Sequence, residues 1–178
     1  MNKKILVLGA GGFIGGHLAK RLKEDGNVVV GADIKKHEYF NHDDICNDFI
    51  VGDLRDQKLV SDIFDHPLGK FDEVYQLAAD MGGALYIFTG EHDADVMHNS
   101  AQINLNVAYE SVKTKVGRVF YSSSACIYPE HNQLDPDNPN CEESSAYPAN
   151  PDSEYGWEKL FSERLYLSFS RNHGLETR

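Results

Sequence analysis

Cysteine is scarce in this chain of 178 residues, and its few thiols follow no pattern that builds a scaffold or a metal site. The three cysteines are Cys46, Cys126 and Cys141, an odd number at wide and irregular intervals. A disulfide framework or a zinc site needs paired cysteines, or cysteines with histidines, at short fixed spacings. We therefore expect free thiols, no bound metal, the reducing environment of the cytoplasm, and solvated loop positions for His37 and His42.

Long apolar runs and an excess of basic residues are also missing. No stretch approaches the roughly 20 apolar residues that a membrane-spanning helix needs, and the apolar stretch near the N-terminus is too short for a signal peptide. The chain has 17 Lys and Arg against 28 Asp and Glu, which gives a net charge of −11 and a pI near 5.1. Such an acidic chain repels a phosphate backbone, so we expect neither a membrane nor a nucleic acid as its partner.

What the sequence does have is a glycine-rich turn between a strand pattern and a helix pattern. The turn reads Gly9-Ala10-Gly11-Gly12-Phe13-Ile14-Gly15. In a dinucleotide-binding turn, Gly9 allows the tight bend, Gly12 lets a pyrophosphate approach the backbone, and Gly15 lets the helix pack on the strand. The predicted helix begins at Phe13 and Ile14. Its free N–H groups are then expected to point at the phosphates. The alternative is an ordinary glycine-rich loop, but the flanking patterns favour a cofactor.

An acid at the end of the second apolar stretch indicates which dinucleotide binds. Asp33 stands at the distance from the glycines where a carboxylate accepts hydrogen bonds from both adenosine ribose hydroxyls. The same carboxylate repels a 2′-phosphate, which favours NAD over NADP. Lys35 and Lys36 weaken that inference because they would attract a phosphate, and a solvated strand-end acid is the other interpretation. Asp53 and Leu54 follow the third apolar stretch and are predicted to frame the adenine.

Strand and helix patterns alternate along the whole chain. Alternation of this kind predicts an α/β fold of the Rossmann type, with a doubly wound parallel sheet covered by helices on both faces. The length suits one NAD-binding domain over residues 1–178, with a long loop at 129–151. The expected strands are 4–9, 27–32, 48–51, 73–77 and 117–122, and the expected helices are 13–25, 57–65, 94–114 and 153–173. The residues after the last helix are typical of the start of another strand.

Tyr155 and Lys159 form a Tyr-x-x-x-Lys pattern on a predicted helix, and the four-residue spacing places both side chains on one face. A nearby ammonium lowers the pKa of a tyrosine, so we expect Tyr155 to act as a general base for a sugar hydroxyl. Lys159 is also placed to hold the nicotinamide ribose. Ser124 ends a predicted strand about thirty residues earlier and offers a hydroxyl to the same oxygen, unless it only caps a turn.

These motifs together resemble the extended short-chain dehydrogenases/reductases, in the group of nucleotide-sugar epimerases and dehydratases. The resemblance covers essentially the whole chain and includes Leu77, Ala78 and Ala79 at the cofactor and Asn99 at the start of the long helix. It implies NAD as cofactor, a nucleotide-sugar substrate and a homodimer built on the helices at 94–114 and 153–173. The apolar residues of the second helix support a second buried face.

Two segments are similar to the 3,5-epimerase branch of that group, which acts on a GDP-hexose. The first contains Met81, Gly82 and Gly83, and the second contains Ser124 and Cys126; both are predicted to bind the sugar nucleotide. The resemblance implies oxidation at C4, exchange of protons at C3 and C5, and re-reduction at C4. A thiolate at Cys126 has the chemistry to remove such a proton, although a small buried packing residue is the alternative.

The family's later strands, its substrate-binding part and its second acid are not found among these residues. We therefore expect this chain to be an N-terminal portion that shows little turnover by itself. Two other functions stay open: a nucleotide-sugar 4-epimerase or 4,6-dehydratase of the same group, and a non-catalytic NAD-binding fragment. A dehydratase needs an Asp-Glu pair where Ala125 and Cys126 stand, which makes it the less favoured enzyme.

Overall fold

The computed structural model describes residues 2–178, which form two compact units. The first contains the residues up to Ala79, Gln102–Ser122 and Leu165–Arg178. The second contains Asp80–Ala101 and Ser123–Arg164. Two long helices, α5 (Asp93–Lys113) and α6 (Glu154–His173), each contribute residues to both units.

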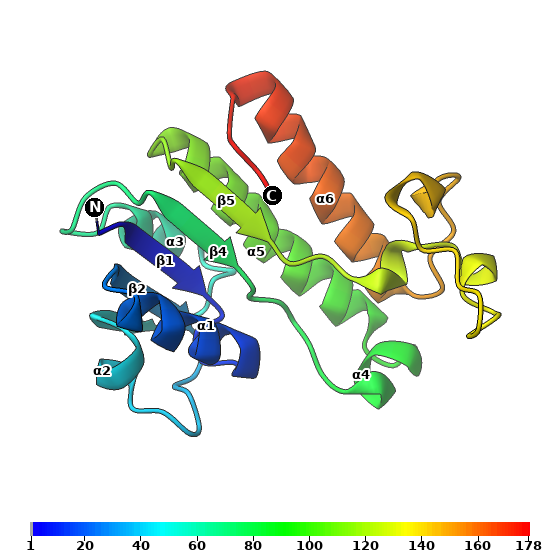
Figure 1. The fold of residues 1–178 in the computed structure, drawn as a ribbon, viewed down its shortest axis with the longest axis horizontal. Helices are drawn as coiled ribbons and strands as arrows, with labels where there is room; N and C mark the ends of the chain where they lie inside the picture. Colours follow the sequence, from blue (N-terminus) through cyan, green and yellow to red (C-terminus); the bar gives the residue numbers. More distant parts are fainter. Residues whose placement is uncertain (1) are drawn as a thin grey trace. The chain divides into compact units, whose positions relative to one another are not determined.

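The first unit holds a five-stranded, wholly parallel sheet, which confirms the predicted Rossmann-type fold (Figure 1). Its strand order is β3-β2-β1-β4-β5, so the chain changes direction in the sheet between β1 and β4. In such sheets ligands bind beyond the carboxyl ends of the strands at this switch point. The strands are β1 (Lys4–Leu8), β2 (Val28–Asp33), β3 (Asp48–Val51), β4 (Glu73–Gln76) and β5 (Arg118–Tyr121).

Alternate side chains of β1 enter two different cores, as the period of a strand requires. Leu6 and Leu8 join the larger core with α3 (Gln57–Phe64), α5 and α6. Ile5 and Val7 join the smaller core with α1 (Phe13–Glu24) and α2 (His42–Ile45). Helices therefore cover both faces of β1, which explains why its sequence is a continuous apolar run.

The open face of β4 and β5 departs from this arrangement. Val74 and Val119 are fully buried beneath the larger core, whereas Phe120 keeps 39% of its surface exposed. Tyr75 lies beside Phe120, with ring centroids 5.7 Å apart. The prediction of helices on both faces therefore holds for β1, and the outer face of β5 is exposed within the described residues.

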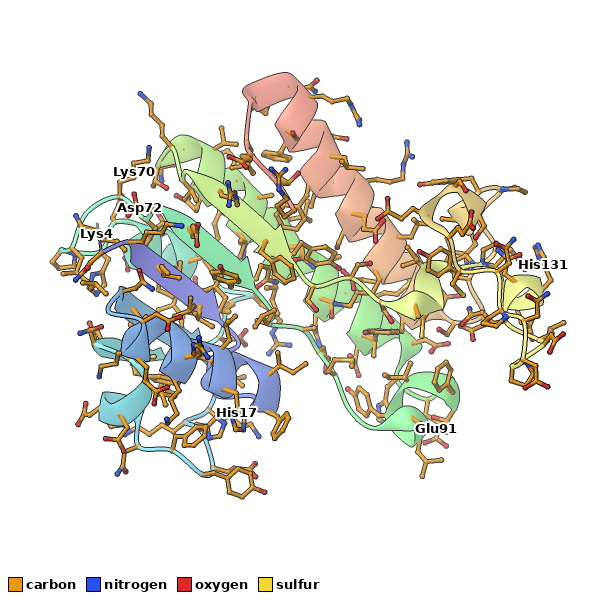
Figure 2. The ribbon with its side chains drawn as sticks, viewed as in Figure 1. Lys4, His17, Lys70, Asp72, Glu91 and His131 are labelled. Atoms are coloured by element: carbon orange, nitrogen blue, oxygen red, sulfur yellow. The ribbon has the colours of Figure 1, made fainter. Side chains whose placement is uncertain are left out.

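Main-chain hydrogen bonds continue the sheet past β5, and a hydrogen bond from the main chain to a side chain links the starts of β1 and β4. The Val119 N–H donates to the Glu176 carbonyl at 2.8 Å, and the Arg178 N–H donates to the Val119 carbonyl at 2.9 Å. This parallel bridge confirms that the residues after α6 begin a further strand. At the amino ends of the strands, the Lys4 N–H donates to the Asp72 carboxylate at 2.8 Å, and both residues are labelled in Figure 2.

The second unit contains α4 (Ala84–Phe88), the first turns of α5 and α6, and three short 3-10 turns. Its small core is formed by Ile87, Val96 and Tyr155. The loop predicted at 129–151 contains two of these turns. The turns span Ala125–Ile127, Glu130–Asn132 and Glu143–Ala146. Across the described residues, no helix combines the length and the apolar character that crossing a membrane requires.

Candidate functional site

The glycine turn joins the carboxyl end of β1 to α1 at the switch point of the sheet. Gly9 has φ 88°, and a Cβ there would lie 2.8 Å from the backbone nitrogen of Ala78. Only glycine accepts both the conformation and this close approach. A Cβ at Gly15 would overlap the Gly9 carbonyl. The helix N-terminus is thus held directly against the end of β1.

The first turn of α1 is built to face an anion. Its N-cap is Gly12, which supplies no side-chain acceptor, and the turn carries no acidic residue. A helix N-terminus without its own cap or acid leaves its N–H groups and positive dipole end for a phosphate. Phe13 and Ile14 are 71% and 68% exposed in this turn. The residues present therefore fit the pyrophosphate of a dinucleotide, which is the cofactor predicted from the sequence.

Asp33 is tied to the glycine turn by the backbone. One carboxylate oxygen accepts from the Gly11 N–H at 3.0 Å, and the other accepts from the Lys35 N–H at 3.1 Å. A Cβ at Gly11 would lie 2.8 Å from the carboxyl carbon of Asp33. Each carboxylate oxygen retains further acceptor capacity, so the half-buried acid is fixed in orientation and can still accept ribose hydroxyls.

Asp53 and Leu54 have partners of their own. The Asp53 carboxylate accepts a forked pair of hydrogen bonds from Arg55, at 2.9 Å from Nε and 2.6 Å from Nη2. Arg55 holds the pKa of Asp53 below its ordinary value. Leu54 is 4% exposed and packs in the larger core, and its carbonyl accepts from the Asn106 amide. Contact of either residue with an adenine stays a prediction.

A buried amide network, which the sequence analysis missed, holds the segment after β4. Gln76 is 1% exposed, and its side chain bonds both the N–H and the carbonyl of Ala78, at 3.3 and 2.9 Å. It also donates to Asn104 at 2.9 Å, and Asn104 accepts from the Tyr166 hydroxyl. This network fixes Ala78 where it meets Gly9, and the neighbouring Leu77 and Ala79 are half-buried. The available signal was a polar residue at the end of a buried strand.

The second unit brings together the predicted catalytic residues. Ser124 caps the first 3-10 turn by accepting from the Cys126 N–H at 3.2 Å. Its hydroxyl also lies close enough to Tyr155, which is 7% exposed, to lower the pKa of that phenol. The Lys159 ammonium lies 5.6 Å from the centre of the Tyr155 ring. Ser124, Tyr155 and Lys159 therefore share one buried corner.

Burial shifts the pKa of both titrating groups of this corner toward their neutral forms. It raises the pKa of Tyr155, with Cys126 and Glu158 adding to the rise and the Ser124 hydrogen bond opposing it. It lowers the pKa of Lys159, and Glu158 opposes that change. The sequence predicts a lowered pKa for Tyr155; the structure gives a raised one, because removing a phenolate from water outweighs the effect of its neighbours.

Cys126 packs beside the tyrosine, against the core of Ile87, Val96 and Tyr155. Gly156 makes this packing possible, since a Cβ there would overlap the Cys126 carbonyl and lie 2.8 Å from Cβ of Pro151. The thiol is free and half-buried. It is therefore a small residue in a packed cluster and also a nucleophilic atom next to the predicted base.

The segment predicted to bind the sugar nucleotide is exposed. Met81 is 53% exposed, and Gly82 and Gly83 are also exposed at the N-terminus of α4. Asp80 anchors the segment: its carboxylate accepts from the Asn99 amide at 2.6 Å and from the Tyr86 hydroxyl at 3.1 Å. This contact gives the predicted Asn99 a structural role.

Comparison with known proteins gives matches along nearly the entire chain. The model of the NAD dependent epimerase/dehydratase family matches residues 5–178. GDP-mannose 3,5-epimerase of Arabidopsis thaliana is 40% identical over 177 residues, which cover 99% of this chain and 45% of that protein. A probable UDP-arabinose 4-epimerase of the same plant is 31% identical over 180 residues, covering 94% of this chain and 40% of the relative.

The fold is also shared with solved structures. UDP-glucose 4-epimerase from Thermotoga maritima, solved with UDP-glucose, superposes with a TM-score of 0.81 at 28% identity. The match covers 98% of this chain and 53% of that one. The chain thus spans about half the length of the relatives it matches.

Proposed function

This chain belongs to the NAD-dependent epimerase/dehydratase family, and on that premise we propose that it carries the nucleotide-binding part of a GDP-mannose 3,5-epimerase. The observation that carries the choice within the family is Cys126, a free thiol packed against the predicted base Tyr155. The 40% identity to a plant GDP-mannose 3,5-epimerase supports it.

In this proposal the first unit binds NAD, the cofactor of the family. Gly9, Gly12 and Gly15 surround the pyrophosphate, and Asp33 accepts the hydroxyls of the adenosine ribose. Asp33 also repels a 2′-phosphate. When bound, NAD in its oxidised form would supply the two-electron acceptor for conversion of a sugar C4 alcohol to a ketone, and its reduced form would supply the two electrons for the reverse conversion.

Tyr155, Ser124 and Lys159 manage the proton on the C4 oxygen. Tyr155 takes this proton during oxidation and returns it during reduction. With its raised pKa the phenol is protonated at neutral pH, which suits the reductive direction. In the oxidative direction the Ser124 hydrogen bond stabilises the phenolate, since it lowers the tyrosine pKa, and Lys159 supplies positive charge beside the ring.

Cys126 acts on different atoms of the sugar. A ketone at C4 acidifies the C–H bonds at C3 and C5, and a thiolate can remove a proton from either carbon. Inversion requires a second acid on the opposite face of the ring. The segment 81–83 contacts the GDP-hexose in this proposal, and its exposure leaves it accessible to a substrate.

We further propose that the protein forms a homodimer through α5 and α6. Leu105 and Tyr109 lie one turn apart on α5 and are 42% and 54% exposed. Leu167 on α6 is 49% exposed. Large apolar side chains in such number are typical of a helix face that a partner covers.

A UDP-sugar 4-epimerase is the second candidate. It is favoured by the 31% identity to a probable UDP-arabinose 4-epimerase and by the structural similarity to UDP-glucose 4-epimerase. Such an enzyme needs the oxidation at C4 and the residues Tyr155, Ser124 and Lys159. Such an enzyme removes no proton from C3 or C5, so Cys126 would have no proton to remove.

Isotope exchange separates the two candidates. The protein encoded by the full reading frame is incubated with NAD in deuterium oxide, with GDP-mannose in one reaction and a UDP-sugar in another, and each sugar is followed by NMR. Deuterium at C3 and C5 supports the 3,5-epimerase. Inversion of a UDP-sugar at C4, without deuterium at C3 or C5, overturns it in favour of the 4-epimerase.

Two variants assign the roles within this experiment. Cys126→Ala should allow oxidation at C4 but reduce deuterium exchange by at least about 100-fold, the size of a typical acid–base contribution. Tyr155→Phe should prevent oxidation and every later step. Exchange at an unchanged rate in Cys126→Ala would make the thiol a packing residue.

A further inference from the structure

Gly16 has no part in the dinucleotide turn, which needs only Gly9, Gly12 and Gly15. It is nevertheless buried in the first turns of α1, and a Cβ there would overlap the imidazole of His37. The three nearest atoms to that Cβ all belong to His37. Because Gly16 has no side chain, α1 leaves space at this position for the His37 ring.

His37 was expected to be a solvated loop residue, and the structure corrects this: the side chain is 8% exposed. Its Nδ1 accepts two backbone hydrogen bonds, from Tyr39 N–H at 3.0 Å and Phe40 N–H at 3.2 Å. The ring stacks on Phe40 at 4.6 Å. His17 approaches both rings edge-on, and Figure 2 labels it on α1 beside the loop that follows β2.

The loop that His37 holds also orients Asp33. The Lys35 N–H donates to the Asp33 carboxylate, and the Lys35 carbonyl lies where a side chain at Gly11 would be. Residues 34–36 are therefore fixed at one end by the glycine turn and at the other by His37. A nitrogen that accepts two N–H groups carries no proton, so this arrangement requires Nδ1 to be deprotonated.

We propose that His37, seated on Gly16, is a positioning residue that orients Asp33 for the adenosine ribose. The proposal rests on the proposed NAD site. Without an acceptor at the position of Nδ1, the Tyr39 and Phe40 N–H groups would lose both hydrogen bonds. NAD affinity should then fall, because the loop would no longer hold Asp33 in place.

The test compares two substitutions that differ in the acceptor. His37→Asn places an amide oxygen near the position of Nδ1 and cannot titrate, whereas His37→Ala removes the acceptor. We expect His37→Ala to weaken NAD binding by about tenfold at pH about 7.5, and His37→Asn to change it by less than about twofold.

Gly16→Ala provides a check through the other partner. In the wild-type background it should expel the ring and weaken NAD binding as much as His37→Ala does. In the His37→Ala background it should cause no further loss, because the space that it fills is then empty. Additive losses would mean that Gly16 serves the cofactor turn directly.

Two outcomes separate this inference from the proposed function. If wild type binds NAD and every variant binds it equally, the role of His37 is refuted and the NAD site stands. If wild type binds no NAD, the proposed cofactor site fails. Amide hydrogen exchange at Tyr39 and Phe40 then tests the capping contact alone. Protection of both amides in wild type and His37→Asn that is lost in His37→Ala supports the contact, and equal exchange in all three proteins refutes it.

Discussion

Backbone contacts, more than side-chain charges, shape the nucleotide site at the scale of single residues. Gly9 meets Ala78, Gly11 meets Asp33, and Gly16 meets His37. The sequence indicates why Gly9 is a glycine, because the spacing of the dinucleotide glycines has a known geometric reason. It does not indicate the partner residue of any of the three contacts, since these partners are distant in the sequence and follow no periodic pattern.

The role of Asp33 can be tested by changing the carboxylate. Asp33→Ala should weaken NAD binding by about tenfold and reduce the preference for NAD over NADP, because the acid both accepts the ribose hydroxyls and repels a 2′-phosphate. Calorimetric titration with both dinucleotides measures the change. Asp53→Ala is the matched control, since that acid is paired with Arg55, and it should affect the preference less. Tighter binding of NADP by the unmodified protein would contradict the assignment.

The three cysteines should differ in reactivity. Burial raises the pKa of the Cys46 thiol to about 12, so this thiol stays protonated at neutral pH and is shielded by the smaller core. Cys126 and Cys141 are partly exposed. Native alkylation with iodoacetamide should therefore modify these two residues and spare Cys46, and unfolding in urea should add the third label by mass spectrometry. Rapid native labelling of Cys46 would disprove its burial.

Tyr155 should make stability depend on pH at the alkaline end. Its pKa in the folded state lies above the ordinary value of 10.0. Folding therefore favours the neutral phenol, and this contribution is fully present below about pH 10 and is lost as the pH rises through the folded-state pKa. Tyr155→Phe should lose less stability than wild type above about pH 10 in urea unfolding. Tyr39→Phe, which alters a side chain that is 79% exposed, should follow wild type; identical curves for all three proteins would contradict the burial effect.

At the scale of elements, the sequence predicts the long helices and the strands with ends that differ from the structure by at most one residue. For example, the expected helix at 57–65 is α3 at Gln57–Phe64, and the expected strand at 48–51 is β3. Their apolar residues recur at a regular spacing over enough residues for the pattern to be recognised in the sequence. The short helices α2 and α4 were missed, because four or five residues are too few for a periodic pattern to emerge.

The start of α6 contains Gly156, at a position where alanine has the higher intrinsic helix propensity. Gly156→Ala gains helix propensity of about 1 kcal/mol, yet its methyl group would overlap the Cys126 carbonyl. We expect a net destabilisation of about 1–3 kcal/mol by urea unfolding, as for other overpacked sites. Gly83→Ala is the control, since nothing lies within 4 Å of a Cβ there. A more stable Gly156→Ala protein would show that α6 can move away from Cys126 at little cost.

At the scale of the whole molecule, the alternation of strands and helices predicts a parallel sheet but not the order of its strands. The order β3-β2-β1-β4-β5 arises because the chain changes direction after β3, and this choice depends on long-range packing. The alternation also does not indicate the open face of β5 at Phe120, because it predicts helices on both faces of the sheet. The outer surfaces of α5 and β5 are therefore two alternative surfaces for the association of two copies of this chain.

Substitutions on these two surfaces decide which one is used. If the proposed dimer forms through α5 and α6, Leu105→Glu and Tyr109→Glu should shift the protein from dimer to monomer in sedimentation velocity at micromolar concentration, because each places a charge where apolar side chains are buried. Phe120→Glu alters the exposed sheet face and should leave the dimer intact. The reverse result, with only Phe120→Glu monomeric, would place the contact on β5. A wild-type monomer would mean that the exposed residues of α5 serve no self-association.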